Sequence, residues 1–327
     1  LYSDATLLGA AGGPSALGGS LAVSSGRFYA PGADRSGADL NMVVTQAGRA
    51  ADFQAAEGAT GMGYFSIDRF SAGGFANLDL GYFYLPDASP IPYGGNVDFR
   101  GDVAVRAPGQ LRLAGGGVIK ADGHISLHAA SITVGQPYQA PLNPSDPYQP
   151  FRRFDGGTGS TPQLFVAPTS GTGRVTASAS HIDAGNLVLG GIGSASLAAN
   201  GGDLRGYGSV NMAGDLTVQA ARIYPSTLGN FDLFAYDNSL SGAAGSITVL
   251  SSGAAGAPLS AGGNLRLMAA SIDQGGTLRA PLGSITLGWD GSGAAPANAV
   301  TGAASALPAT ANLVLGAASM TSVSADG

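Results

Sequence analysis

Two histidines stand four residues apart, His124 and His128, a spacing that on a helix would turn both imidazoles toward one metal ion. The residues around them instead alternate between apolar and polar types, which predicts a strand. On a strand the two side chains share a face but lie about 13 Å apart at about 3.3 Å per residue, too far to share one ion. The third histidine, His181, has no partner in sequence. We therefore interpret all three as surface residues and predict no metal site.

Opposite charges alternate a little earlier in the chain, at Asp98, Arg100, Asp102 and Arg106. Carbohydrate-active enzymes need carboxylates gathered on one flank, and this group comes nearest to that arrangement. The alternation of signs predicts instead a solvated face whose charges pair with one another. The group contains the tripeptide Arg100-Gly101-Asp102, which integrins bind on exposed loops. Its neighbours alternate as in a strand, which is a poor display for a receptor.

Aromatic and basic residues also gather in a proline-rich stretch, residues 136–171. Prolines at this density cannot sit in a β-ladder, so the stretch is predicted to be a loop extruded from the fold. Loops on repeat folds often carry binding functions. The candidate partner-binding residues are Tyr138, Tyr148, Phe151, Arg152, Arg153 and Phe154. The alternative is that the aromatic residues only pin the loop onto the flank of the fold.

Other chemistries find no support in the sequence. The Gly-x-Ser-x-Gly nucleophile elbow, the phosphate-binding Gly-x-x-x-x-Gly-Lys loop and the tandem calcium nonapeptide do not occur. A net charge of −6, with Lys120 as the single lysine among 15 basic residues, argues against a nucleic-acid partner. We therefore predict no catalytic, cofactor-binding or metal-binding residues, and a protein that is not an enzyme.

The elements that carry these residues are set by a glycine-led motif that occurs four times, at residues 123–132, 173–182, 214–223 and 263–272. Counted from the glycine, apolar or small residues fall at offsets two, four and six, as in a half-buried strand. The apolar residue at offset nine breaks this parity, so the chain should turn a corner before it. The start-to-start spacings of 50, 41 and 49 residues would each correspond to about two coils of a β-solenoid.

Shorter glycine-led strands recur between the four copies, too closely spaced for helices to connect them. We predict an all-β parallel β-solenoid, a single domain over residues 1–327 that is a segment of a longer protein. Four stretches interrupt the alternation and are predicted to be excursions, at about residues 46–69, 136–171, 224–242 and 289–311. The first contains the one plausible helix, at residues 50–57.

Several segments resemble a known family. Residues 263–267, 275–288, 312–324 and 180–187 are similar to the coils of filamentous-haemagglutinin-type exoproteins, the passengers of two-partner secretion in Gram-negative bacteria. The resemblance covers most of the chain from about Gly95 onward. It implies a right-handed parallel β-helix, export through an outer-membrane transporter partner, and a place at the cell surface or outside the cell. The Asn-Pro-Asn-Gly motif of the family's secretion domain is not found in the sequence.

We therefore expect a structural and adhesive rod segment of a large secreted surface protein, whose loops contact host or cell-surface glycans or proteins. Two alternatives remain open. One is a carbohydrate-active β-helix enzyme of the polysaccharide lyase or hydrolase kind. The other is a filament subunit whose bare ends associate with one another, since uncapped strand edges favour stacking.

Overall fold

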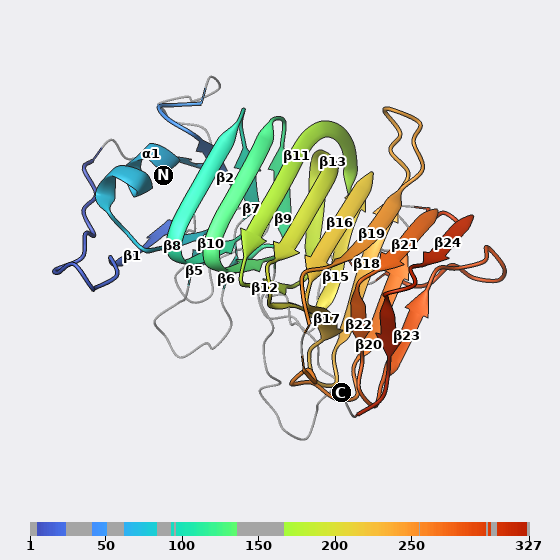
Figure 1. Cartoon of the computed structure of the whole chain (residues 1–327). Helices are drawn as coiled ribbons and strands as arrows, with labels where there is room; N and C mark the ends of the chain where they lie inside the picture. Colours follow the sequence, from blue (N-terminus) through green and yellow to red (C-terminus); the bar gives the residue numbers. More distant parts are fainter. Residues whose placement is uncertain are drawn as a thin grey trace, which may run out of the picture.

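The fold is all-β in the computed structural model, which describes residues 5–23, 41–50, 62–83, 93–94, 96–135, 167–254, 256–298, 300–301 and 306–325. Within these residues, 23 strands join in one sheet, and its strand pairings are parallel (Figure 1). β5 (Tyr82–Phe83) and β6 (Tyr93–Gly94) form a separate antiparallel pair. The predictions of an all-β class and of parallel pairing are confirmed.

The parallel pairings run along three ladders. Ladder 1 contains β8 (Val103–Leu113), β10 (His124–Val134), β11 (Thr169–Ala179), β13 (Leu187–Ala199), β16 (Asp215–Ala220), β19 (Ser246–Ser251), β21 (Ser271–Gly275) and β24 (Asn312–Leu315). Ladder 2 contains β1 (Ser20–Val23), β4 (Asn77–Leu80), the second halves of β8 and β10, β12 (His181–Ala184), β14 (Asp203–Gly206), β17 (Arg222–Pro225), β22 (Thr277–Arg279) and β25 (Met320–Ser322). Ladder 3 contains β3 (Met62–Ser66), β2 (Asn41–Thr45), β7 (Asn96–Phe99), β9 (Val118–Ala121), the start of β13, β15 (Gly208–Ala213), β18 (Asn230–Tyr236), β20 (Asn264–Met268) and β23 (Ser284–Leu287).

From β7 onward the chain passes through ladders 3, 1 and 2 in turn, and we call one such passage a coil. Two coils of the described chain lack one strand: no ladder 3 strand is described between β10 and β11, and no ladder 2 strand lies between β19 and β20. Where nothing interrupts the coils, they are short: Val175, Ala195 and Leu216 occupy one register of ladder 1, with steps of 20 and 21 residues. Inward-facing side chains from all three ladders form one continuous apolar core along the stack of coils. Each coil therefore buries its apolar residues only against the coils beside it.

The parity break at offset nine of the motif does mark corners. Ile132, Ile182 and Ile223 lie on ladder 2 and are fully buried, while the strand before each of them lies on ladder 1. The fourth copy turns a different corner, from Leu265 on ladder 3 to Ile272 on ladder 1. The spacings also differ from the predicted two coils. The first spacing, from Gly123 to Gly173, covers a single coil, which includes residues 136–166. The second spacing, from Gly173 to Gly214, is the only one that covers two full coils.

The leading glycines are required because successive coils approach closely at these corners. A Cβ added at Gly123 would lie 2.4 Å from the carbonyl oxygen of Gly101, in the neighbouring coil. Gly214 has a φ of 139°, and a Cβ there would lie 2.2 Å from the carbonyl oxygen of Gly193. A side chain at either position would push the backbones apart, which explains why each copy of the motif begins with glycine.

The predicted excursions have mixed outcomes. Residues 51–61 and 136–166 lie outside the described residues, and most of the predicted helix at residues 50–57 lies there too. The excursion predicted at residues 46–69 is wrong over β3, which pairs with β2 in ladder 3, and the one predicted at residues 136–171 is wrong at its end, where β11 begins at Thr169. The excursion predicted at residues 224–242 is wrong in its middle, because β18 pairs with both β15 and β20 in ladder 3. Its two faces are both buried, which removes the alternation expected of a half-buried strand. Residues 289–311 contain no strand in their described part, as predicted.

The one helix of the described residues, α1 (Ile67–Gly73), lies at the amino-terminal end of the stack (Figure 1). Ile67 and Phe70 point into the core and are 0% and 1% exposed, and Phe70 stacks on Phe75 with ring centroids 6.1 Å apart. The backbone N–H of Gly9 donates to the carbonyl of Gly73, which ties the amino-terminal segment to the helix. The helix therefore covers the apolar end of the first coils.

The last coil of the described residues has no such cover. β24 is exposed at all four of its residues, and Leu313 and Leu315 continue the inward-facing rows of Ile272 and Gln274 with 45% and 59% of their surface exposed. Gln274 sits fully buried one coil earlier. Its side-chain amide donates to the carbonyls of Gly276 and Met320 and accepts from the Gly276 N–H, so the buried polar group is satisfied.

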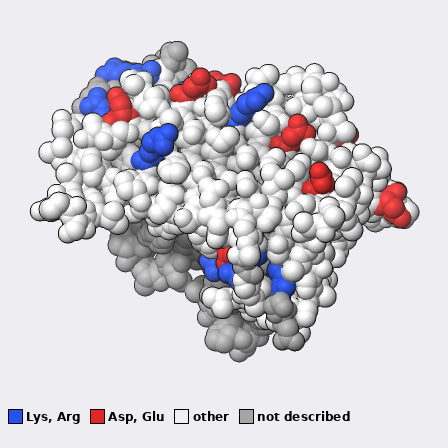
Figure 2. All heavy atoms as spheres, in the orientation of Figure 1, with Lys and Arg blue, Asp and Glu red and all other residues white. Residues whose placement is uncertain are grey.

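Charged residues are sparse on the face that ladder 1 presents in Figure 2, where isolated basic and acidic patches are separated by wide uncharged areas. A further group of basic side chains lies along the lower side of that view, the side on which Figure 1 places β12 and β17. The described residues include no helix that is long and apolar enough to cross a membrane.

Candidate functional site

The three histidines lie on the outer surface, as predicted. His124 and His128 project outward from ladder 1, where His124 Nε2 lies 3.4 Å from Thr176 Oγ1. His181 Nε2 lies 3.3 Å from Asp183 Oδ1 on the neighbouring ladder. Within the described ranges, no group of three or more histidine, aspartate or glutamate side chains is placed to hold a metal ion.

The tripeptide Arg100-Gly101-Asp102 forms an exposed corner between β7 and β8, rather than the strand interior that its neighbours indicated. Gly101 makes the turn with a φ of 68°. Both charged side chains are engaged: Arg100 pairs with Asp98 at 2.7 Å, and Asp102 accepts from the backbone N–H of His124 at 2.8 Å. The Asp98–Arg100 pair fits the predicted self-paired face, and Asp102 works as a connection between coils.

The aromatic and basic residues proposed for partner binding all lie outside the described residues, so their arrangement stays a prediction: Tyr138, Tyr148, Phe151, Arg152, Arg153 and Phe154. The described chain leaves ladder 2 at Gly135, where an added Cβ would lie 2.5 Å from the carbonyl oxygen of Asn186. That corner lies beside Gly185, which lines the groove described below.

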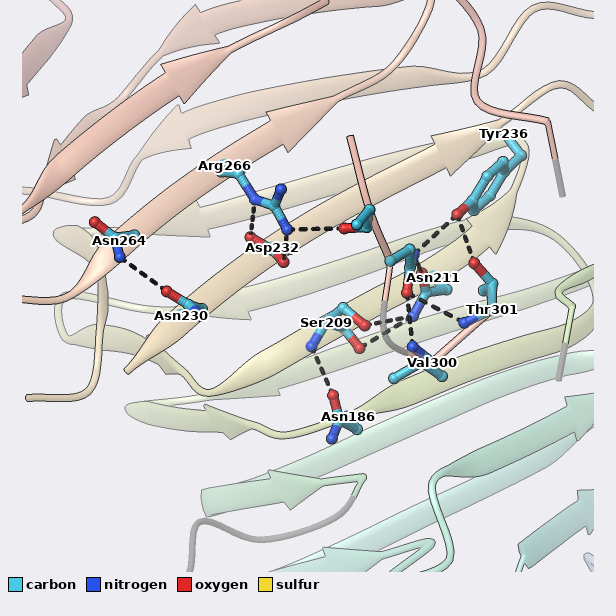
Figure 3. Close-up of polar contacts among 12 residues, drawn as sticks. Asn186, Ser209, Asn211, Asn230, Asp232, Tyr236, Asn264, Arg266, Val300 and Thr301 are labelled. Atoms are coloured by element: carbon cyan, nitrogen blue, oxygen red, sulfur yellow. Dashed lines mark hydrogen bonds and ion pairs between the residues drawn. The ribbon is translucent and has the colours of Figure 1, made fainter. Parts of the chain in front are cut away.

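A set of cross-strand ion pairs lies along ladder 2. On its outer face, Asp79, Asp183 and Asp203 stand directly opposite an arginine of the next strand. The resulting ion pairs are Asp79–Arg112 at 3.0 Å, Asp183–Arg205 at 2.7 Å and Asp203–Arg222 at 2.6 Å. Opposite charges at facing positions of neighbouring strands stabilise a sheet. The same pairing recurs on ladder 3 between Asp232 and Arg266 (Figure 3).

A groove of about 530 Å³ lies over this row of ion pairs. Its lining comes from four strands of ladder 2 and from the corners and segment beside them, and includes Gln110, Arg112, Thr133, Asp183, Arg205, Tyr207, Ser226, Thr227 and Leu259. The volume is within the range typical of small-molecule sites.

Asp183 in the groove and Asp203 beside it are both held in their ionised form. Burial raises the pKa of Asp183, but hydrogen bonds from His181 and Arg205 outweigh it, and the pKa lies below its ordinary value. The pKa of Asp203 is also lowered, because hydrogen bonds from Arg222 and Tyr224 outweigh the effect of burial. Burial and the bond to Asp203 raise the pKa of Tyr224 to about 12. None of these three groups is therefore tuned to exchange a proton near neutral pH.

The described residues 289–298 and 300–301, here called the strap, fold back over the outside of ladder 3. Asn298 donates from Nδ2 to Asn211 Oδ1 and to the hydroxyl of Tyr236, which lies 3.1 Å from Thr301 Oγ1 (Figure 3). Asn211 and Thr301 are fully buried. Phe234, Tyr236 and Met268 form a second apolar cluster against Trp289 and Leu307. The strap is thus a packed element, and nothing in its lining points to a ligand.

Comparison with known proteins found no match among family models, curated proteins or solved structures. The groove was not predicted from the sequence. The ion pairs of ladder 2 join residues 33, 22 and 19 positions apart (112−79, 205−183 and 222−203), and coils of unequal length hide that register. Geometrically, the groove offers rigid donors and acceptors with neutralised charges, which suits binding rather than proton transfer.

Proposed function

We propose that the chain is a right-handed parallel β-helix segment that serves as a structural and adhesive rod in a large secreted surface protein. The observation that carries this proposal is the repeated passage of the chain through three parallel ladders around one core. Such a stack grows along one axis, so its length scales with the number of coils. Right-handed connection is the strong preference for parallel strands.

The sequence resemblance to filamentous-haemagglutinin-type exoproteins supplies the cellular part of the proposal. In that reading, an outer-membrane transporter exports the chain, and the coils hold binding surfaces away from a Gram-negative cell. The cross-coil ion pairs and corner hydrogen bonds support the rod role, because they tie each coil to the next. The extruded segments and the groove on ladder 2 are the surfaces that would contact glycans or proteins.

The alternative of a carbohydrate-active enzyme is less well supported. Hydrolysis of a glycosidic bond needs one carboxyl group that keeps its proton and a second that is ionised. Asp183 and Asp203, the carboxylates nearest to the groove, both have a lowered pKa and both are bound by arginine. We expect no turnover of polysaccharides by the purified chain, and release of reducing ends in a colorimetric assay would contradict this.

The cellular proposal can be tested with antibodies against the chain on intact cells of the organism that produces it. The expected result is labelling of intact cells or of the culture supernatant, and loss of labelling after mild protease treatment. Deleting the outer-membrane transporter gene should leave the chain inside the cells. Labelling that requires cell lysis in the wild-type strain would overturn the proposal.

A further inference from the structure

The groove on ladder 2 runs along the stack of coils, across the strands. Gln110 and Arg112 of β8, Thr133 of β10, Asp183 of β12 and Arg205 of β14 line it in succession. Ser226 and Thr227, at the corner after β17, complete its far end. The four strands and the corner after β17 together span four spacings of about 4.8 Å, so the groove is about 19 Å long. A ligand that fills it must therefore be extended.

Several polar groups in the groove form no hydrogen bond with any described residue. These groups are the side-chain amide of Gln110, the hydroxyls of Thr133 and Thr227, and Nη1 of Arg205, whose Nε and Nη2 both donate to Asp183. They include donors and acceptors in similar number. Since Arg205 is fixed by its bidentate bond, its free N–H groups have a set direction, and little side-chain entropy is lost on binding.

The charged side chains in and beside the groove neutralise one another. Its two arginines, Arg112 and Arg205, are each paired with a carboxylate, Asp79 and Asp183. Leu259 stands at the rim with 92% of its surface exposed, which is unusual for a leucine and supplies an apolar contact. Balanced donors and acceptors, no net charge and an apolar edge together match the surface of an uncharged sugar chain, whose hydroxyls and C–H faces alternate.

We propose that this groove binds a neutral oligosaccharide that lies along the stack of coils. The inference deepens the adhesive role proposed above and rests on it for its biological meaning. The groove is far smaller than a protein–protein interface, which favours a slender ligand over a folded partner. The oligosaccharide would accept from Arg205, exchange hydrogen bonds with Gln110, Thr133 and Thr227, and place a C–H face against Leu259.

The test uses the purified chain, isothermal titration calorimetry and four tetrasaccharide probes: cellotetraose, maltotetraose, chitotetraose and a sulfated heparin tetrasaccharide. We expect at least one neutral probe to bind. Thr133→Trp, which fills the groove, should weaken that binding at least tenfold. The matched control is Thr248→Trp, because Thr248 is also a half-buried outward threonine, but on ladder 1. This control should bind as the wild type does.

Circular dichroism and thermal melting establish whether both variants fold. If Thr133→Trp does not, the double variant Gln110→Ala with Thr227→Ala takes its place, since both side chains are exposed, and the same tenfold loss is expected. Binding of the sulfated probe alone, no binding of any neutral probe at millimolar concentration, or equal effects of the groove and control variants would each overturn the proposal. The two proposals can fail separately. A negative binding result would not change the outcome of the cell-labelling experiment, and oligosaccharide binding by the purified chain can be measured even if cell labelling fails.

Discussion

The two ends of the stack of coils are built differently. At the amino-terminal end, α1 lays Ile67 and Phe70 over the core, where they are at most 1% exposed. At the carboxyl-terminal end, Leu313 and Leu315 occupy core rows but keep about half of their surface in water. The same inward pattern is therefore covered at one end of the described stack and exposed at the other.

This difference shows that the repeated strand pattern does not by itself determine whether the terminal coil of the described stack is covered. A helix satisfies its own backbone groups and can cover an apolar end, whereas β24 presents an unpaired edge in the described structure. Head-to-tail stacking of identical copies requires two open ends. For isolated copies of this chain, α1 lies over one end of the described stack, so we expect association through the β24 end to give a pair.

The largest effect should come from removing the core contact of the cap. Phe70→Ala should destabilise the protein by about 3–5 kcal/mol, because it leaves a cavity at a fully packed site. Leu315→Ala, at the open end, should change stability by at most about 0.5 kcal/mol, since that side chain is already 59% exposed. Urea unfolding followed by circular dichroism measures both. Equal costs would contradict the contrast between the ends.

A smaller effect concerns self-association. We expect the chain to form dimers at high concentration through the carboxyl-terminal edge, and sedimentation velocity should show a concentration-dependent monomer–dimer equilibrium. Leu313→Lys with Leu315→Lys should weaken dimerisation at least tenfold, because two charges would have to be buried or brought face to face.

Leu8→Lys is the matched control for that prediction, since Leu8 is 78% exposed near the amino-terminal end. It should leave the dimer unchanged. Long filaments, or a dimer that Leu8→Lys disrupts while the double lysine variant does not, would show that the amino-terminal end takes part in association.

The smallest effect is in the pH dependence of stability. Near the amino-terminal end, burial outweighs the bond from Arg112 and raises the pKa of Asp79 above 3.8. In the groove, the pKa of Asp183 lies below 3.8, because hydrogen bonds from His181 and Arg205 outweigh burial. Ionised Asp183 therefore stabilises the fold above its unfolded pKa, and this contribution is lost as the pH falls through the folded pKa. Asp79 has the opposite sign, since its folded form takes up a proton first.

Replacing each carboxylate by its amide separates the two contributions. Between pH 5 and 2, Asp183→Asn should lose less stability on acidification than the wild type, and Asp79→Asn should lose more. Urea midpoints at several pH values measure the slopes. Identical slopes for the two variants would mean that the two ion pairs have the same environment.

The sequence was sufficient to predict the strands and their corners, because glycine spacing and parity follow from backbone geometry. Ile132, Ile182 and Ile223 all lie beyond a corner, as offset nine predicted. The sequence pattern led to a wrong prediction for β18, because its outward side chains Phe234 and Tyr236 are covered by the strap. A strand buried on both faces loses the alternation by which strands are recognised.

The candidate site was less accessible to sequence reasoning. Asp183 and Arg205 meet only because the coil between them has 22 residues, and other coils differ by the length of their insertions. The one signal that was present is chemical: aspartates and arginines recur at outward positions of short strands. Without the register, this pattern predicted paired charges at Asp98 and Arg100 but not the groove on ladder 2.

The strap gives the carboxyl-terminal half of the molecule a property that a simple stack lacks. It is bonded to Asn211 of β15, to Tyr236 of β18 and, through the carbonyl of Ala297, to Arg266 of β20. A tether pulling on the last coils would peel them one at a time until the load reached these bonds. The three coils bonded to the strap would then have to unfold together. The strap would therefore raise the force needed to unfold the protein beyond that point.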